Sequence, residues 1–147
     1  MRRDFPECIT VCHVMKEEDV RMAFRHPAVM LASDGLTNNG QGHPRAAGSF
    51  ARFLAEFARK DTITLYQAIE KMTAQPAARL GLANKGRLNA GADADIAVFD
   101  YETIQDSATF AEPALHPRGI EYVLIGGEIA LEKGEILKAN YGKAVRK

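Results

Sequence analysis

Residues 26–35 read HPAVMLASDG, and this stretch decides the fold. Its apolar centre, Val29–Ala32, predicts a short strand that is covered on both faces, and the pair Asp34-Gly35 supplies the turn that ends it. The preceding residues 16–26 begin with acidic side chains and continue with apolar ones at helical spacing, which predicts a short helix. A partly β-branched apolar run at residues 9–15 predicts an earlier strand. Strand, helix and strand in this order are typical of a parallel βαβ unit.

A polar loop and three helices are predicted next. Residues 36–48 are rich in glycine and asparagine, and this composition favours a loop over a regular element. Residues 49–60 place four large apolar side chains on one helical face opposite charged ones, with a serine available as N-cap. Thr64 and Gln67 fit a capping box that opens a further helix, and residues 76–81 fit one more short helix that a glycine ends.

The last part of the chain is predicted to consist of strands and turns. Residues 94–100 contain an apolar strand-like run, and residues 122–131 divide at Gly126-Gly127, a pair that favours a two-residue hairpin. Between them, the polar and proline-containing residues 101–119 indicate a long connection. The sequence therefore predicts an α/β chain that ends in a small β module.

Composition limits the classes of partner. The chain has 147 residues, of which 46% are hydrophobic and 26% charged, as in ordinary globular proteins. Nineteen basic residues balance nineteen acidic ones, so no electrostatic footprint for nucleic acid or an anionic membrane is visible. No apolar run approaches the roughly 20 residues of a membrane span, and the first residues lack the apolar core of a signal peptide. We expect a cytoplasmic protein without nucleic-acid or membrane partners.

Asp34, His43 and Arg45 are the candidate functional residues. A carboxylate that directly follows a buried parallel strand lies at the edge where α/β proteins bind ligands. His43 and Arg45 follow in the next loop, and an arginine fork suits a carboxylate or a polarised carbonyl. Two alternatives stay open, because Asp34 also suits a turn or helix cap, and single histidines and arginines are common on surface loops.

A zinc site built from Cys8, Cys12, His13 and His26 is not favoured. Their spacing differs from that of zinc motifs, and Cys12 and His13 would point to opposite faces of a strand. We expect both cysteines to be reduced, buried, small apolar residues.

Several motifs resemble those of one enzyme family. They are residues 26–35 quoted above, His43-Pro44-Arg45, Lys71-Met72-Thr73, Pro76–Leu82 (PAARLGL), Lys85–Leu88 (KGRL) and Gly91–Asp100 (GADADIAVFD). With Val123–Gly127 (VLIGG), they span most of residues 14–130. Through them the chain resembles the C-terminal part of an N-acyl-D-amino-acid deacylase (D-aminoacylase), a branch of the metal-dependent amidohydrolase superfamily.

The resemblance implies a distorted (β/α)₈ barrel that carries the metal site, with a small β-sandwich beside it. Residues 1–84 would be a remnant of the barrel, comprising its last βα units and the following helices. Residues 85–147 would be the C-terminal part of the sandwich.

The resemblance also implies roles for the candidate residues. Asp34 would contact a zinc ion and shuttle a proton from the nucleophilic water to the leaving amine, which is general acid–base chemistry that a carboxylate beside zinc can perform. His43 and Arg45 would help to close the substrate pocket, with Arg45 binding the carboxylate of an N-acyl-D-amino acid.

The family's other metal ligands are a His-x-His pair, a bridging cysteine or modified lysine, and later histidines, all of which would precede residue 1. Because a complete barrel needs about 250 residues, we expect this chain to be an incomplete part of the enzyme. Alone, it is expected to be inactive and to self-associate through exposed strand edges. The alternatives are a non-catalytic β-containing domain for packing or association, and an amidohydrolase that acts on cyclic amides.

Overall fold

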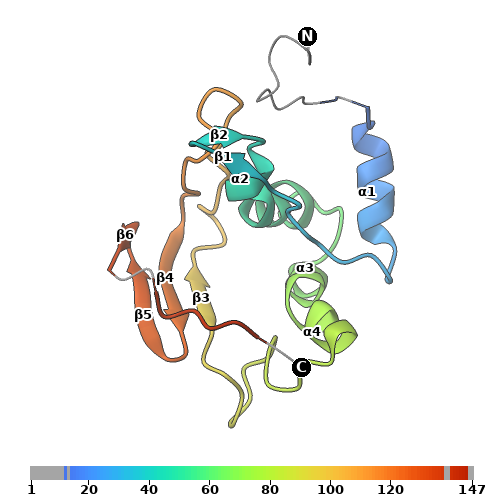
Figure 1. Cartoon of the computed structure of the whole chain (residues 1–147). Coiled ribbons are helices and arrows are strands. Elements are labelled where there is room, and N and C mark those ends of the chain that lie inside the picture. Colours follow the sequence, from blue (N-terminus) through green and yellow to red (C-terminus); the bar gives the residue numbers. More distant parts are fainter. Residues whose placement is uncertain (1–11, 13, 138–139, 146–147) are drawn as a thin grey trace.

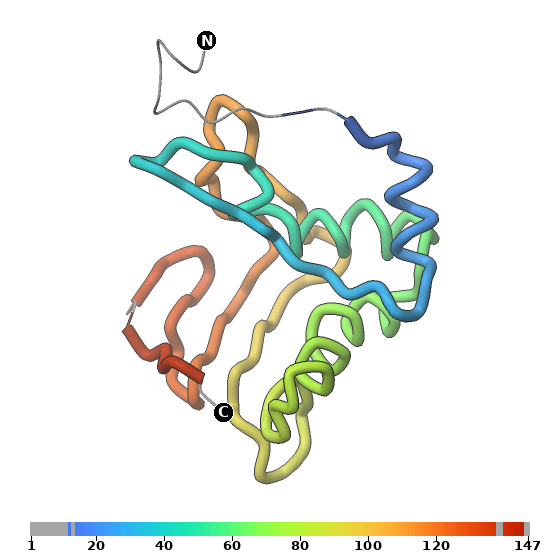
Figure 2. Tube along the Cα trace, turned by 45° about the vertical axis from the view of Figure 1, so that its right-hand side comes forward, coloured from blue at the N-terminus to red at the C-terminus, as the bar shows by residue number. Residues whose placement is uncertain are grey.

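The computed structural model describes residue 12, residues 14–137 and residues 140–145. Helices occupy the earlier part of the chain and a four-stranded sheet the later part, and both views place them side by side (Figure 1, Figure 2). The predicted α/β character is therefore confirmed. Among the described residues, no helix is long and apolar enough to cross a membrane.

Helix α1 spans Glu17–Arg25, as the acidic start and apolar spacing predict, and gives way to extended backbone at His26. Helix α2 (Arg45–Arg52) continues directly into a π-helix, η1 (Phe53–Ala58). Helix α2 thus begins before the predicted serine N-cap. Gly48 lies inside α2 without breaking it, and its lack of a side chain permits close packing: a Cβ at this position would lie 1.9 Å from Oδ1 of Asp106.

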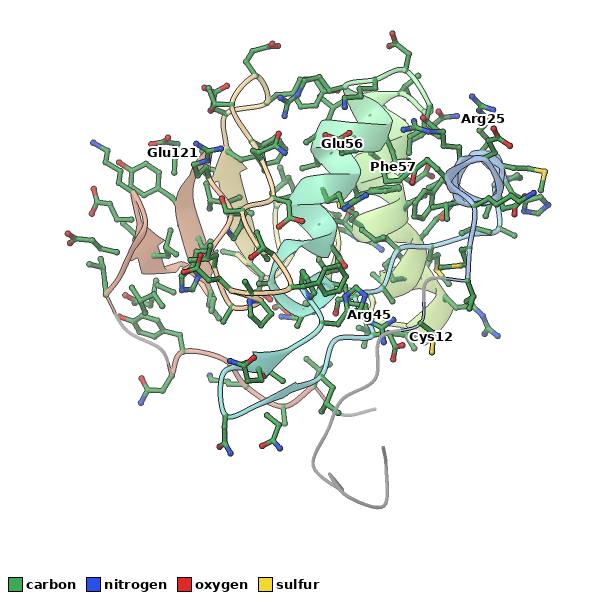
Figure 3. The ribbon with its side chains drawn as sticks, turned by 90° about the horizontal axis from the view of Figure 1, so that it is seen from above. Cys12, Arg25, Arg45, Glu56, Phe57 and Glu121 are labelled. Carbon is green, nitrogen blue, oxygen red and sulfur yellow. The ribbon has the colours of Figure 1, made fainter. Side chains whose placement is uncertain are left out.

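Aromatic side chains join α1 to η1 and form the core. Phe53 and Phe57 are buried, and the ring of Phe24 meets them edge-on at centroid distances of 4.6 and 4.8 Å. Figure 3 shows Phe57 on the side of its helix that faces α1. Phe50, expected on the same face, remains 46% exposed.

Helices α3 (Leu65–Met72) and α4 (Ala74–Leu80) follow. The predicted capping box is confirmed, since the Thr64 side chain accepts from the Gln67 amide at 3.2 Å and the Gln67 side chain accepts from the Thr64 amide at 2.9 Å. Helix α4 begins ahead of Pro76 and ends at Gly81, which adopts the left-handed conformation with φ of 69°.

The sheet is antiparallel with strand order β3-β4-β5-β6. Its strands are β3 (Ile96–Phe99), β4 (Ile120–Ile125), β5 (Glu128–Glu132) and β6 (Glu135–Ile136). The β4–β5 hairpin turns at Gly126-Gly127 as predicted, and both glycines have positive φ, 61° and 88°. Strand β3 pairs with β4 on one side only, so its other edge is a sheet edge within the described structure.

The long connection between β3 and β4 packs back on the helices. Ile104, in its first part, is 1% exposed and belongs to the aromatic core. The Arg59 guanidinium donates to the carbonyls of Glu102 and Ile104, which fixes this connection to the end of η1. An isolated antiparallel β-bridge pairs Gln105 with Arg118 and so brings the early and late parts of the connection together.

The parallel βαβ prediction is wrong for the described residues. Residues 29–32 belong to no strand, and both sheets of the described chain are antiparallel. Most of the predicted strand at residues 9–15 lies outside the described residues. A strand forms only when its backbone pairs with a neighbouring strand, and the described chain supplies no such neighbour to residues 29–32. The predicted loop at 36–48 also differs, since it holds a small hairpin of β1 (Thr37–Asn38) and β2 (Gln41–Gly42) before α2 begins.

Candidate functional site

Asp34 lies in the extended segment ahead of the β1–β2 hairpin. Its φ is 45°, in the left-handed region that non-glycine residues rarely adopt but that aspartate tolerates better than most. The next residue, Gly35, packs directly on the start of α2, because a Cβ there would lie 2.4 Å from Cα of Ala46. Only a glycine permits this approach, which brings Asp34 next to the first turn of α2.

An ion pair joins two of the predicted site residues. Nη2 of Arg45 donates to Oδ2 of Asp34 at 2.9 Å, across the small hairpin that separates them in sequence. Figure 3 shows Arg45 at the start of α2, beside the segment that precedes the helix. The two side chains are 45% and 86% exposed, so both remain accessible to a ligand. Exposed pairs of this kind contribute little to folding stability.

His43 lies one residue before the N-cap of α2. Its Nδ1 accepts from the backbone amide of Arg45 at 3.1 Å, and its ring meets that of Phe110 edge-on at 5.3 Å. The imidazole thus helps to start α2 and fixes the backbone of Arg45. The structure brings the side chains of Asp34 and Arg45 into direct contact, while the His43 ring accepts from the backbone amide of Arg45.

One residue that sequence reasoning missed is Lys71 at the end of α3. It is 3% exposed, and its ammonium group donates to the carbonyls of His26 and Val29 in the segment that leads to Asp34. Burial lowers the pKa of the Lys71 amine from its ordinary value. The sequence signal was weak, because a lysine beside an apolar helical stripe normally extends into solvent.

A metal site is not complete within the described residues, where no group of three or more histidine, cysteine, aspartate or glutamate side chains converges. Asp34 is the one predicted ligand there. Cys12 is exposed, which corrects its expected burial: the predicted buried strand that included it is not formed at residues 12, 14 and 15. Cys8 and His13 lie outside the described residues. Nδ1 of His26 accepts from the amide of Ala28 at 3.2 Å, so this histidine serves a local turn.

A largely apolar cavity of about 780 Å³ lies elsewhere, between the helices and the sheet. Its lining includes Phe50, Leu54, Met72, Ile96 and Phe99, and it contains none of the three predicted site residues. The exposed pair Asp34–Arg45 and this cavity are therefore separate features.

Comparison with known proteins identifies the family. A model described as "Amidohydrolase family" matches residues 16–131. The chain belongs to the amidohydrolase family. Among curated relatives of this amidohydrolase chain, the N-acyl-D-glutamate deacylase of Alcaligenes xylosoxydans xylosoxydans is 48% identical over 114 residues, which are 77% of this chain and 23% of the relative.

Solved amidohydrolase structures agree with this assignment. A D-aminoacylase crystal structure superposes with a TM-score of 0.80 at 37% identity, covering 84% of this chain and 26% of that one. The N-acyl-D-glutamate deacylase of Bordetella bronchiseptica, complexed with zinc and a phosphonate mimic of the tetrahedral intermediate, gives a TM-score of 0.77 at 42% identity over 85% of this chain and 28% of its own. The resemblance found in the sequence is confirmed, and the chain spans about a quarter of the length of these relatives.

Proposed function

We propose that this chain is the part of a zinc-dependent hydrolase that supplies Asp34 and Arg45 to the cleavage of N-acyl-D-amino acids. The observation that carries the proposal is the 2.9 Å contact between these two exposed side chains in a chain of the amidohydrolase family. Relatives named for deacylation of D-amino acids support the substrate class.

In the proposed reaction, Asp34 accepts a proton as water attacks the carbonyl carbon of the amide. It then returns the proton to the nitrogen as the carbon–nitrogen bond breaks, which yields a carboxylic acid and a free D-amino acid. A carboxylate can perform both transfers because it is a base in the first and, once protonated, an acid in the second. Its high exposure supports access by water and substrate.

Arg45 would bind the α-carboxylate of the substrate. A guanidinium has five N–H donors and matches a carboxylate with two parallel hydrogen bonds. One donor contacts Asp34 in this structure, so a substrate carboxylate on the remaining donors would lie next to the proton-transferring group. His43 would support this arrangement by fixing the backbone of Arg45 and closing the substrate pocket.

Zinc belongs to the proposal as a cofactor, with Asp34 as the ligand from this chain. The described residues do not form a zinc site by themselves, so the remaining ligands would come from the rest of the enzyme. We also propose that residues 1–84 correspond to the last units of a distorted barrel and residues 85–147 to part of a β-sandwich, in a cytoplasmic enzyme. The order of elements supports this division, because helices α1 to α4 precede residue 85 and the strands of the four-stranded sheet follow it (Figure 2).

The test is a substrate panel with the zinc-loaded full-length protein that contains this chain. N-acetyl-D-glutamate, its L-enantiomer, the matching N-acetyl amine without the α-carboxylate, and a six-membered cyclic amide are compared at equal concentration. We expect hydrolysis of the D-enantiomer, loss of activity on chelation, and a strongly raised KM without the α-carboxylate. Preference for the cyclic amide would favour the alternative amidohydrolase reaction, and inactivity on every substrate would favour a non-catalytic domain.

A further inference from the structure

The segment that precedes Asp34 is held by the last turn of α3. Nζ of Lys71 donates to the carbonyls of His26 and Val29, each at 2.7 Å. The carbonyl of Lys71 accepts from the amide of Leu31 at 3.2 Å. One residue of α3 therefore makes three hydrogen bonds to the backbone of a segment that is more than 35 positions earlier in the sequence.

Helix α4 adds a fourth hydrogen bond to the same segment. Nε2 of Gln75 donates to the carbonyl of Pro27 at 3.0 Å. We call these four hydrogen bonds, made by Lys71 and Gln75 to residues 26–31, the 26–31 clamp.

Burying the Lys71 ammonium group at this position carries an unfavourable desolvation free energy. Lysine is almost never fully buried unless its charge is compensated, and Lys71 is only 3% exposed. A methionine or leucine would fill the same space without removing an ammonium group from water. The compensation that the structure provides consists of the two carbonyls and a place in the last helical turn, where the helix dipole favours a cation. The main contribution of Lys71 is therefore its hydrogen bonds, and not the space that its side chain fills.

Residues 29–32 have the composition of a strand but no strand partner in the described structure. The clamp ends at Leu31, three residues before Asp34. Beyond the clamp, Asp34 adopts a φ of 45°, and Gly35 rests on Ala46. The backbone on both sides of Asp34 is thus held, by the clamp before it and by the packing of Gly35 on α2 after it.

We propose that Lys71 is a positioning residue for Asp34, acting through the 26–31 clamp. This inference rests on the proposed function, in which Asp34 transfers the proton. Because a proton-transferring group acts in the transition state, misplacing it lowers kcat more than it changes KM. Arg45 belongs to α2 and makes no contact with the clamp among the hydrogen bonds of the described chain, so binding of the substrate carboxylate should be preserved.

The experiment compares Lys71→Met with the matched control Arg59→Met in the zinc-loaded full-length protein. Arg59 is also a cation that holds two backbone carbonyls, but these belong to Glu102 and Ile104 in the connection after β3. Kinetics are normalised to the zinc-loaded, folded fraction, and amide hydrogen exchange is followed by mass spectrometry in peptides that cover residues 26–34 and 100–105. Should Lys71→Met fail to fold, Gln75→Leu removes only the hydrogen bond to Pro27 and provides the same comparison with a smaller effect.

Lys71→Met is expected to speed exchange in peptide 26–34 and to lower kcat by about 100-fold, the scale of a misplaced catalytic group, with KM changed by less than about twofold. Arg59→Met should speed exchange in peptide 100–105 and leave kcat within about twofold of wild type. Unchanged exchange in peptide 26–34, or faster exchange with an unchanged kcat, would overturn the inference. If instead the proposed function is wrong, the Asp34→Asn variant will retain its activity, and this result distinguishes the two failures.

Discussion

Replacing Phe53 with alanine tests the account of the core. The side chain is 1% exposed, and its ring contacts those of Phe24 and Phe57 at 4.6 and 5.9 Å. Truncating a buried phenylalanine costs about 3–5 kcal/mol, of which the aromatic geometry accounts for about 0.5–1.5 kcal/mol per pair. Against a typical total stability of about 5–15 kcal/mol, this is a large share. Urea unfolding followed by far-UV circular dichroism measures the change in the free energy of unfolding.

The matched control is Phe50→Ala on the same stretch of helix. Phe50 is 46% exposed, and since burying a whole phenylalanine side chain is worth about 1.5–3 kcal/mol, its truncation should cost only about 1 kcal/mol. If Phe53→Ala lowers the free energy of unfolding no more than Phe50→Ala does, the assignment of the core to the contact between α1 and η1 is wrong.

Three further predictions concern the site, the sheet and the strand edge. Arg45→Ala should raise KM in the full-length protein while changing the free energy of unfolding by less than about 1 kcal/mol, because its ion pair with Asp34 is exposed; an unchanged KM with a lower kcat would contradict substrate binding. The Lys85 ammonium and the Gly126 amide hold the pKa of Asp95 below its ordinary value of 3.8, so the stability they provide is present above that pH and is lost as pH falls further. In the Asp95→Asn variant, the free energy of unfolding measured with urea should fall less steeply as pH is lowered below 3.8. The same dependence of this free energy on pH in the variant and the wild type would refute the prediction. The isolated chain should show a light-scattering mass above that of one chain, because one edge of β3 has no strand partner among the described residues, and Val98→Lys on this strand should reduce the mass; a monomer at all concentrations would contradict it.

Local signals predicted local structure well. The capping box of Thr64 and Gln67 and the turn at Gly126-Gly127 were predictable because each depends on neighbouring residues alone. The strand at residues 29–32 was not, because a strand exists only with a partner, and pairing is decided by parts of the chain that the pattern does not contain.

The site was predictable in part for the same reason. Asp34 and Arg45 were selected by residue type and position, and the structure adds that they touch. That contact depends on Gly35 lying against Ala46, a packing detail that the sequence does not reveal. Lys71 was missed because a charged residue next to an apolar stripe reads as solvent-exposed, whereas here two distant carbonyls hold its ammonium group.

The most direct test of the central claim is the kcat of the Asp34→Asn variant of the zinc-loaded full-length protein with N-acetyl-D-glutamate. The amide side chain keeps the shape of the carboxylate but cannot accept the proton. Since general acid–base catalysis contributes about 100-fold or more, we predict a fall in kcat of at least this size, with the fold and the bound zinc retained as measured by circular dichroism and metal analysis. A folded, zinc-loaded variant that keeps more than about a tenth of the wild-type kcat would contradict the role of Asp34.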